Sequence, residues 1–194
     1  MFHCVSSLFY EASSATRPLI LGKGGFGIQL AEWLVAEGWP TPQFLDDNAP
    51  DCAGKLRDYA DPALLVASRP AFVALGNNAL RTELLQKLAA VGYATPVWCS
   101  KRAAVSPTAM LGPGTVVLPF AYVGARAQIG NGCILNAGCI VDHNATLGNG
   151  VHVAPGGIVK AGAVVPDGSK VESGTVVRSP WEQPADTAQA APQP

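Results

Sequence analysis

The sequence predicts a chain of two parts, a small α/β unit with parallel strands followed by an all-β parallel β-helix. Three observations predict this architecture. Aliphatic residues recur at every sixth position through the second half of the chain. Many of the 21 glycines fall at fixed places within that period. Near the start, a short apolar strand, a glycine-rich turn and a helix with apolar residues at helical spacing follow one another.

The α/β part is predicted over residues 18–102, with strands at 18–21, 43–47, 71–75 and 93–99. Its first strand leads into Gly22-Lys-Gly-Gly-Phe-Gly27 and a helix that ends at Gly38. In such a turn, backbone N–H groups and the helix N-terminus face an anion. The segment therefore predicts a phosphate-binding turn in a Rossmann-like parallel βαβ unit. The alternative is that the glycines only allow the helix to pack on its strand.

Two further loops of this unit carry candidate ligand-binding residues. The second strand ends in Asp46 and Asp47, at about the distance from the glycine turn where such folds place an acid on a ribose or base. The third strand leads into Gly76. The unit is too small for a complete doubly wound sheet, so a nucleotide or nucleotide-sugar is expected here rather than a dinucleotide.

The six-residue period runs from Val105 to Val177, and the residue four positions later is nearly always small. An aliphatic side chain at this step fills the interior of a coil built from three short strands, and glycine permits the tight corners. Three hexads to a turn predict four turns over residues 103–178. A β-sandwich is the alternative, but it would not keep a six-residue register without insertions. The repeat resembles that of the hexapeptide-repeat acyltransferases, which implies a left-handed β-helix and a homotrimer.

His143 and His152 lie nine residues apart within this repeat, at positions where side chains point away from the coil interior. An exposed imidazole titrates near neutrality and can take a proton from a nucleophilic hydroxyl or amine. The alternative is that both are corner residues without a special role. No third ligand stands at matching spacing, so no metal site is expected. Cys133 and Cys139 occupy the small inward positions and are predicted to be core residues.

The combined pattern resembles the sialic acid O-acetyltransferase and UDP-amino-sugar N-acetyltransferase family of bacterial glycan pathways, over about residues 19–177. The motifs that carry the resemblance are Leu21-Gly-Lys-Gly-Gly-Phe-Gly27, Phe44-Leu-Asp-Asp47, Ala74-Leu-Gly-Asn-Asn78 with Arg81, Ser106-Pro-Thr-Ala109 and Ile134-Leu-Asn-Ala-Gly-Cys-Ile-Val-Asp-His143.

This resemblance implies an acetyl-CoA-dependent acetyltransferase with a nucleotide-sugar acceptor. It implies that His143 is the general base beside Asn144, where the family usually has an acid. His152 and Gly162 match positions that contact acetyl-CoA. The residues that match the nucleotide-sugar segments are Gly24, Gly25, Phe26, Asp46, Asp47 and Gly76. Three functions remain open: N-acetylation of a UDP-linked amino sugar, O-acetylation of sialic acid or a related sugar, and a non-catalytic sugar-nucleotide-binding trimer.

The composition excludes several classes of partner. Only 14% of residues are charged and the formal net charge is −1, so neither nucleic acid nor an anionic membrane is an expected partner. No apolar run reaches the roughly 20 residues of a membrane-spanning helix, and no secretory signal is recognised. The five cysteines form no C-x-x-C pair, which favours reduced thiols and a cytoplasmic location. Residues 1–17 are an extension without an assigned role, and the Pro/Ala/Gln-rich residues 179–194 are predicted to be disordered.

Overall fold

The computed structural model describes residues 3–4 and 16–182, so most of the 1–17 extension and most of the predicted disordered tail lie outside the described residues. The elements of the α/β part, with one short strand before it, are β1 (His3–Cys4), β2 (Leu19–Leu21), α1 (Gly25–Ala36), β3 (Gln43–Leu45), the 3-10 helix η2 (Leu56–Ala60), β4 (Ala71–Val73) and α2 (Asn78–Ala90). The strands that follow are β5 (Trp98–Cys99), β6 (Ala104–Val105), β7 (Met110–Leu111), β8 (Val116–Val117), β9 (Tyr122–Val123), β10 (Gln128–Ile129), β11 (Ile134–Leu135), β12 (Ile140–Val141), β13 (Thr146–Leu147), β14 (His152–Val153), β15 (Ile158–Val159), β16 (Val164–Val165), β17 (Lys170–Val171) and β18 (Val176–Val177).

The α/β part contains a three-stranded parallel sheet in the order β3-β2-β4. Alternate residues of β2 face opposite sides: Ile20 lies in one core cluster with α1, and Leu19 and Leu21 lie in the other with α2. Both helices end before a glycine with positive φ, Gly38 and Gly92, whose conformation stops a helix at no steric cost. This is the small parallel βαβ unit that the sequence predicts.

The predicted fourth strand, residues 93–99, is wrong as a strand of this sheet. Among the described residues, this segment is joined to the sheet by one isolated parallel bridge, between Ala94 and Pro70, the residue before β4. The segment then passes Pro96, which has no N–H to donate to a strand ladder. Trp98 and Cys99 instead form β5, which pairs with β8 in the all-β part.

The all-β part is a parallel solenoid of about four turns. Strands eighteen residues apart pair in parallel on three faces. We name them the first face (β5, β8, β11, β14, β17), the second face (β6, β9, β12, β15, β18) and the third face (β7, β10, β13, β16), to which β1 adds an antiparallel strand. The aliphatic positions and the small positions fill one interior cluster, as predicted, and Cys133 and Cys139 are fully buried in it. The left-handed sense of the solenoid stays a prediction.

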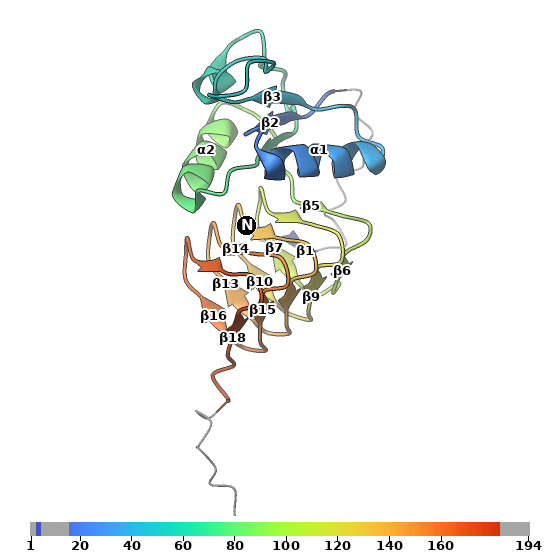
Figure 1. The fold of residues 1–194 in the computed structure, drawn as a ribbon, viewed down its shortest axis with the longest axis vertical. Helices are drawn as coiled ribbons and strands as arrows, with labels where there is room; N and C mark the ends of the chain where they lie inside the picture. The colour runs from blue at the N-terminus through green and yellow to red at the C-terminus, as the bar shows by residue number, and fades with distance from the viewer. Residues whose placement is uncertain (1–2, 5–15, 183–194) are drawn as a thin grey trace, which may run out of the picture.

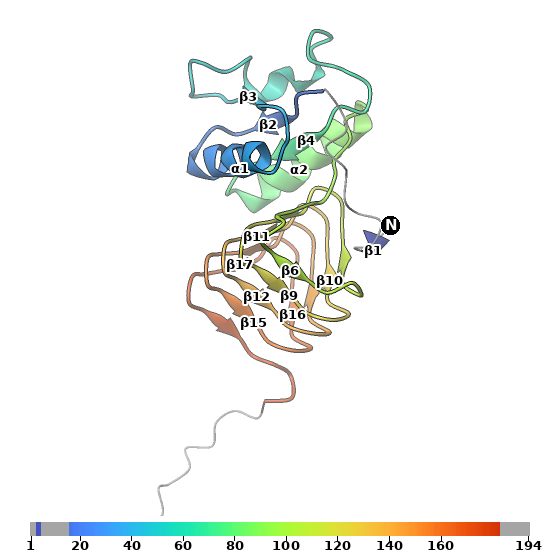
Figure 2. The same cartoon turned by 90° about the vertical axis from the view of Figure 1, so that its right-hand side faces the viewer.

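The three faces meet at three edges, and two of these edges differ in what packs on them. The edge between the second and third faces contains residues 106–109, 124–127, 142–145 and 160–163, and we name it the histidine corner because it carries His143. The edge between the third and first faces contains residues 112–115, 130–133, 148–151 and 166–169, and we name it the helix corner because α2 packs on it. Figures 1 and 2 show the α/β part seated on the solenoid, with α1 and α2 as its nearest elements.

The helix corner packs against α2 because the two structures have nearly the same repeat distance. One turn of an α-helix rises about 5.4 Å, and neighbouring strands of a sheet lie about 4.8 Å apart. Side chains three or four residues apart on α2 therefore meet successive turns of the solenoid. Asn78 meets Gly168, Thr82 meets Gly150, and Leu85 meets both Gly132 and Gly114.

The first face of the solenoid is covered by α1. Trp98 and Val116 project from this face into the same core cluster as Leu30 and Leu34 of α1. At the end of α1, the Glu37 carboxylate accepts hydrogen bonds from the Ser100 hydroxyl at 2.7 Å and from the Lys101 N–H at 2.9 Å. The α/β part therefore occupies the first face and the helix corner, which leaves the histidine corner on the opposite edge of the prism. Among the described residues, no helix is long and apolar enough to cross a membrane.

Candidate active site

His143 lies in the turn between β12 and β13, and its side chain is exposed. The turn is fixed by three contacts. The Asp142 carboxylate accepts the backbone N–H of His143 at 2.6 Å, the Asn144 N–H donates to Ala125 O at 2.9 Å, and Asn144 adopts φ 57°. Asparagine tolerates this left-handed conformation better than most residues. The turn therefore presents the imidazole to solvent on a rigid support.

The Asn144 side chain contacts the imidazole directly. Its Nδ2 lies 2.8 Å from Nδ1 of His143. With the amide nitrogen as donor, Nδ1 is an acceptor and the neutral ring carries its proton on Nε2. When the amide is rotated by 180°, its oxygen accepts from Nδ1–H instead, and Nε2 is left with a free lone pair. Only the second arrangement makes Nε2 a base. Oδ1 of Asp142 accepts the backbone N–H of His143, so the hydrogen bond to the imidazole comes from Asn144.

His152 is not the exposed imidazole that the sequence predicts. It points outward from β14, but on the face covered by the α/β part, and both ring nitrogens are buried without a hydrogen-bond partner among the described residues. Burial and, to a smaller extent, the nearby positive charges of Arg81 and Lys170 together lower the pKa of His152 to about 4. This side chain is therefore a neutral imidazole at physiological pH.

Gly162 occupies the histidine corner one turn after Asn144, and its N–H donates to the carbonyl of His143 at 3.1 Å. The Trp181 ring lies directly on it. A methyl group at Gly162 would be 2.6 Å from Cη2 of that ring. The Trp181 side chain remains 66% exposed, and the adjacent Glu182 carboxylate pairs with the Lys160 ammonium. The chain after β18 thus returns to the edge that carries His143.

The glycine turn contains two glycines that packing requires and two that it does not. A methyl group at Gly27 would lie 2.0 Å from Gly22 O, and Gly22 itself has φ 102°. These two fit the interpretation that glycine lets α1 pack on β2. Gly24 and Gly25, in contrast, are exposed and would meet nothing within 4 Å. No side chain among the described residues caps the start of α1, so its first N–H groups face open space beside the half-buried Phe26.

Asp46 and Asp47 hold the loop after β3. Asp46 accepts the Lys23 N–H at 2.7 Å, and this bond is the main reason why the pKa of Asp46 lies below its usual value. Asp47 accepts the Leu56 N–H at 3.0 Å. Asp47 also borders a cavity of about 560 Å³ that contains the cationic side chains of Lys55, Arg57 and Lys87. Asp46 is thus bound to the glycine turn itself, and Asp47 lies beside a group of cations.

The loops after β2, β3 and β4 converge at the carboxyl edge of the small sheet. Gly22 packs on Ala74 and Leu75, the two residues before Gly76. Gly76 is exposed and would meet nothing within 4 Å of a methyl group. Ligands of parallel α/β sheets bind at this edge. The structure thus brings the predicted nucleotide-binding residues into one neighbourhood, whereas His143 lies on the opposite edge of the solenoid.

Arg81, a polar residue between α2 and the solenoid, is marked by the sequence only as part of a motif. It lies on α2 and is 1% exposed. Burial lowers the pKa of its guanidinium to about 10, so it stays charged at neutral pH. An arginine among the leucines of a helix (Leu80, Leu84, Leu85 and Leu88) was the signal that could have drawn attention to it.

The thiols and possible metal ligands have no part in this site. Burial raises the pKa of Cys133 to about 11 and that of Cys139 to about 12, so both remain protonated thiols. Within the described ranges, no group of three or more His, Cys, Asp or Glu side chains could hold a metal ion.

No protein-family model matches the sequence, and no curated protein matches it. Solved structures do. The acetyltransferase domain of PglB from Neisseria gonorrhoeae, in complex with acetyl coenzyme A, is 27% identical with a TM-score of 0.70, over 81% of this chain and 96% of that one. PerB from Caulobacter crescentus, in complex with CoA and GDP-perosamine, is 26% identical with a TM-score of 0.61, over 84% and 92%. A variant of perosamine N-acetyltransferase from Caulobacter crescentus is 24% identical with a TM-score of 0.74, over 86% and 90%.

The chain shares the fold of these acetyltransferases. The resemblance to hexapeptide-repeat acetyltransferases is therefore supported in general terms, while the link to sialic acid O-acetyltransferases has no counterpart among these structures. The structural neighbours were solved with acetyl coenzyme A or CoA, and two of them with a nucleotide-sugar. Within this fold, His143 is the exposed imidazole of the histidine corner, and the three converging loops carry the residues that the sequence predicts to bind a nucleotide.

Proposed function

We propose that this protein is an acetyl-CoA-dependent N-acetyltransferase that acts on the amino group of a nucleotide-linked amino sugar in glycan biosynthesis. The observation that carries the proposal is the exposed His143 with its Nδ1 held by Asn144. The complexes of PglB with acetyl coenzyme A and of PerB with GDP-perosamine support the same reaction class. Because the PerB acceptor is GDP-linked, both UDP- and GDP-linked amino sugars are candidate substrates.

In the proposed reaction, the acceptor nitrogen attacks the thioester carbonyl carbon while Nε2 of His143 takes a proton from that nitrogen. The carbon–sulfur bond then breaks, and the proton passes from His143 to the departing thiolate. The products are an acetamido sugar and CoA. General-base catalysis of this kind contributes about 10²–10⁴-fold. For this role, the Asn144 amide oxygen must accept from Nδ1–H, so that Nε2 keeps its lone pair.

The active assembly in this proposal is a homotrimer, because one chain does not bring the acceptor loops to its own His143. The second face supports an interface beside the histidine corner. Its outward residues are stacked in register and are apolar, namely Ala104, Tyr122, Ile140, Ile158 and Val176. A second copy that covers this face would lie next to His143. His152 and Gly162 are the proposed donor contacts, and the three converging loops are the proposed acceptor site.

The direct test is turnover with a panel of UDP- and GDP-linked amino sugars, in which CoA release is measured as free thiol. We expect thiol release that requires both substrates and that His143→Ala abolishes. A mixing experiment tests the shared site. Trimers assembled from His143→Ala chains and Gly25→Trp chains, each inactive alone, should regain activity if one chain provides the base and its neighbour the acceptor loops.

Two alternatives have distinct outcomes in the same assay. Thiol release only with sugars that offer a hydroxyl group would favour O-acetylation of sialic acid or a related sugar. Binding of a nucleotide-sugar without any thiol release would favour a non-catalytic binding trimer. The specific observation that favours this last alternative is the amide of Asn144 beside His143, because an amide cannot stabilise the protonated ring by charge as a carboxylate would.

A further inference from the structure

Arg81 lies in the middle of α2 and is buried between the two parts of the chain. Its guanidinium donates three hydrogen bonds, all to backbone carbonyls: Nε to Gly132 O at 2.8 Å, Nη1 to Leu75 O at 2.8 Å and Nη2 to Gly150 O at 2.7 Å. Among the described residues, no carboxylate pairs with it in an ion pair. Burying a cation without a carboxylate partner costs free energy. The three hydrogen bonds to carbonyl oxygens therefore have to hold the guanidinium in place.

The three carbonyls belong to functionally different segments. Gly132 and Gly150 occupy the same position of the helix corner in consecutive turns, with φ 64° and 65°. The residues between them make one complete turn of the solenoid, and that turn carries His143. Leu75 directly precedes Gly76 in the loop after β4. A single side chain therefore joins both ends of the turn that carries the proposed base to one loop of the proposed acceptor site.

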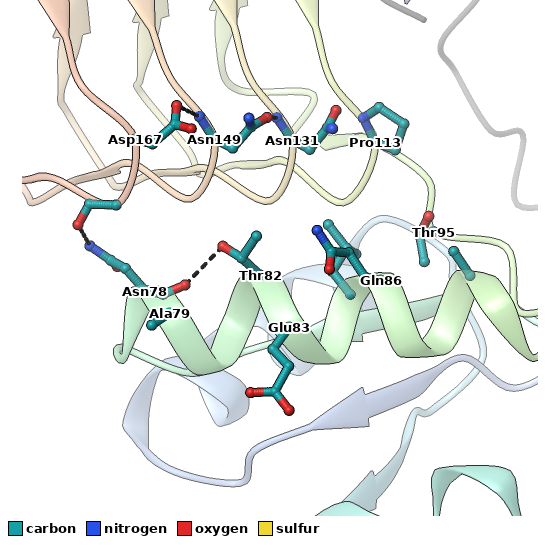
Figure 3. A pocket seen from close by; sticks show the side chains of 13 residues that line it. Asn78, Ala79, Thr82, Glu83, Gln86, Thr95, Pro113, Asn131, Asn149 and Asp167 are labelled. Carbon is teal, nitrogen blue, oxygen red and sulfur yellow. Dashed lines mark hydrogen bonds between the residues drawn. The ribbon is translucent and has the colours of Figure 1, made fainter.

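The guanidinium is suited to this task because its donors form a rigid planar fork. Figure 3 shows α2 running along the helix corner, with Thr82 and Asn78 beside successive turns of the solenoid. Gly150 leaves room for this approach, since a methyl group there would lie 2.5 Å from the Thr82 hydroxyl. A lysine at position 81 would keep the charge but would lose the fork, so it could not hold three diverging carbonyls at once.

We infer that Arg81 is a positioning residue for the acyl transfer, which sets the acceptor loop at residues 75–77 relative to the solenoid turn that carries His143. The inference rests on the proposed function. Arg81 itself is buried and touches no reacting atom. Its effect is on distance and orientation, and a misplacement of about 1 Å in a reacting pair costs on the order of 10²-fold in rate.

The test compares Arg81→Lys with Asn78→Ala in the full chain. Asn78 lies on the same helix and donates to Gly168 O at 2.8 Å and Ser169 O at 3.1 Å, but the turn that begins at these carbonyls does not carry His143. We expect Arg81→Lys to lower kcat/KM for the nucleotide-sugar about 10²-fold, while KM for acetyl-CoA stays within about threefold of the parent. Asn78→Ala should lower the midpoint of thermal unfolding by about as much as Arg81→Lys does, and it should leave kcat unchanged.

A second readout does not depend on turnover. In Arg81→Lys, amide hydrogen exchange should rise together in residues 75–77 and 133–150, whereas in Asn78→Ala it should rise only near residues 168–169. If exchange rises together in both segments but the parent protein shows no turnover, Arg81 still joins the two segments and the proposed function is rejected. Equal kinetic losses in both variants, or exchange that rises uniformly over the chain, would overturn the inference and leave Arg81 as an ordinary interface residue.

Discussion

The helix corner and the histidine corner follow the same repeat but differ in what they can carry. At the helix corner, the four left-handed positions are all glycine, namely Gly114, Gly132, Gly150 and Gly168. At the histidine corner, the left-handed positions include Arg126 and Asn144, with φ 58° and 57°. The first corner is covered by α2, whereas on the described chain the second is open except at Gly162, on which the Trp181 ring lies.

The difference shows that glycine serves two purposes in this solenoid. Under α2 it supplies both the backbone conformation and the space for a helix, as the 2.3 Å approach of Leu85 to a methyl group at Gly114 demonstrates. At positions 126 and 144 of the open corner only the conformation is needed, and residues with side chains meet that need at a moderate cost. The open corner is therefore where the repeat can carry a pair of contacting side chains such as His143 and Asn144.

The largest expected effect is the loss of catalysis on removal of the open-corner imidazole. We expect His143→Ala to lower kcat by about 10²–10⁴-fold, because a general base contributes a factor of this size. Arg126→Gly, at the same corner one turn earlier, is the matched control and should keep its kcat. Both are measured by thiol release at saturating substrates. Equal activity of His143→Ala and the parent would remove the histidine from the mechanism.

The next effect is the loss of stability when a glycine is replaced by alanine, compared between a position under α2 and a position with open space around it. Gly114→Ala combines left-handed strain of about 1–2 kcal/mol with overpacking of about 1–3 kcal/mol against Leu85. Gly138→Ala, with φ 66° and nothing within 4 Å, should show the strain alone. The free energies of unfolding from urea titration give both values. If the two variants were equally destabilised, the packing of α2 on the helix corner would not be the reason for glycine there.

The third effect is a pH dependence of the free energy of unfolding that comes from His152 on the first face. His152 has a pKa of about 4 in the folded chain and an ordinary value of 6.5 when unfolded. Between these pH values the unfolded chain binds more protons, so the free energy of unfolding should fall as the pH is lowered from 6.5 to 4 and should not depend on His152 above 6.5. His152→Phe should lose this part of the pH dependence, as measured by unfolding at several pH values. An unchanged slope would mean that solvent reaches the imidazole.

The smallest effect sharpens the role of Asn144. A carboxylate in Asn144→Asp can only accept from Nδ1–H, so it fixes the tautomer with a free Nε2 lone pair and stabilises the protonated ring. We expect kcat to rise a few-fold at alkaline pH and the acid limb of the pH–rate profile to move to higher pH. A fall in kcat at every pH would show that the amide already serves the base better than a carboxylate would.

Several candidate site residues could be proposed from the sequence because their signal is local. The phosphate-type turn, the acids after β3 and the exposed His143 each follow from a few neighbouring residues. The burial of the His152 ring could not be predicted, because the hexad period says only that its side chain leaves the solenoid, not that another part of the chain covers it. Arg81 was similarly hidden, since its three partners are carbonyls from residues 75, 132 and 150.

The sequence by itself determined the solenoid, its four turns and the small parallel sheet, because these depend on periodicity, glycine conformation and burial of regularly spaced side chains. Only the tertiary structure decided which solenoid face is covered, that the imidazole of His152 is buried and where the two parts of the chain are joined. These features depend on the match between the pitch of α2 and the spacing of the turns, and on hydrogen bonds across more than fifty residues. No local pattern encodes contacts of that range.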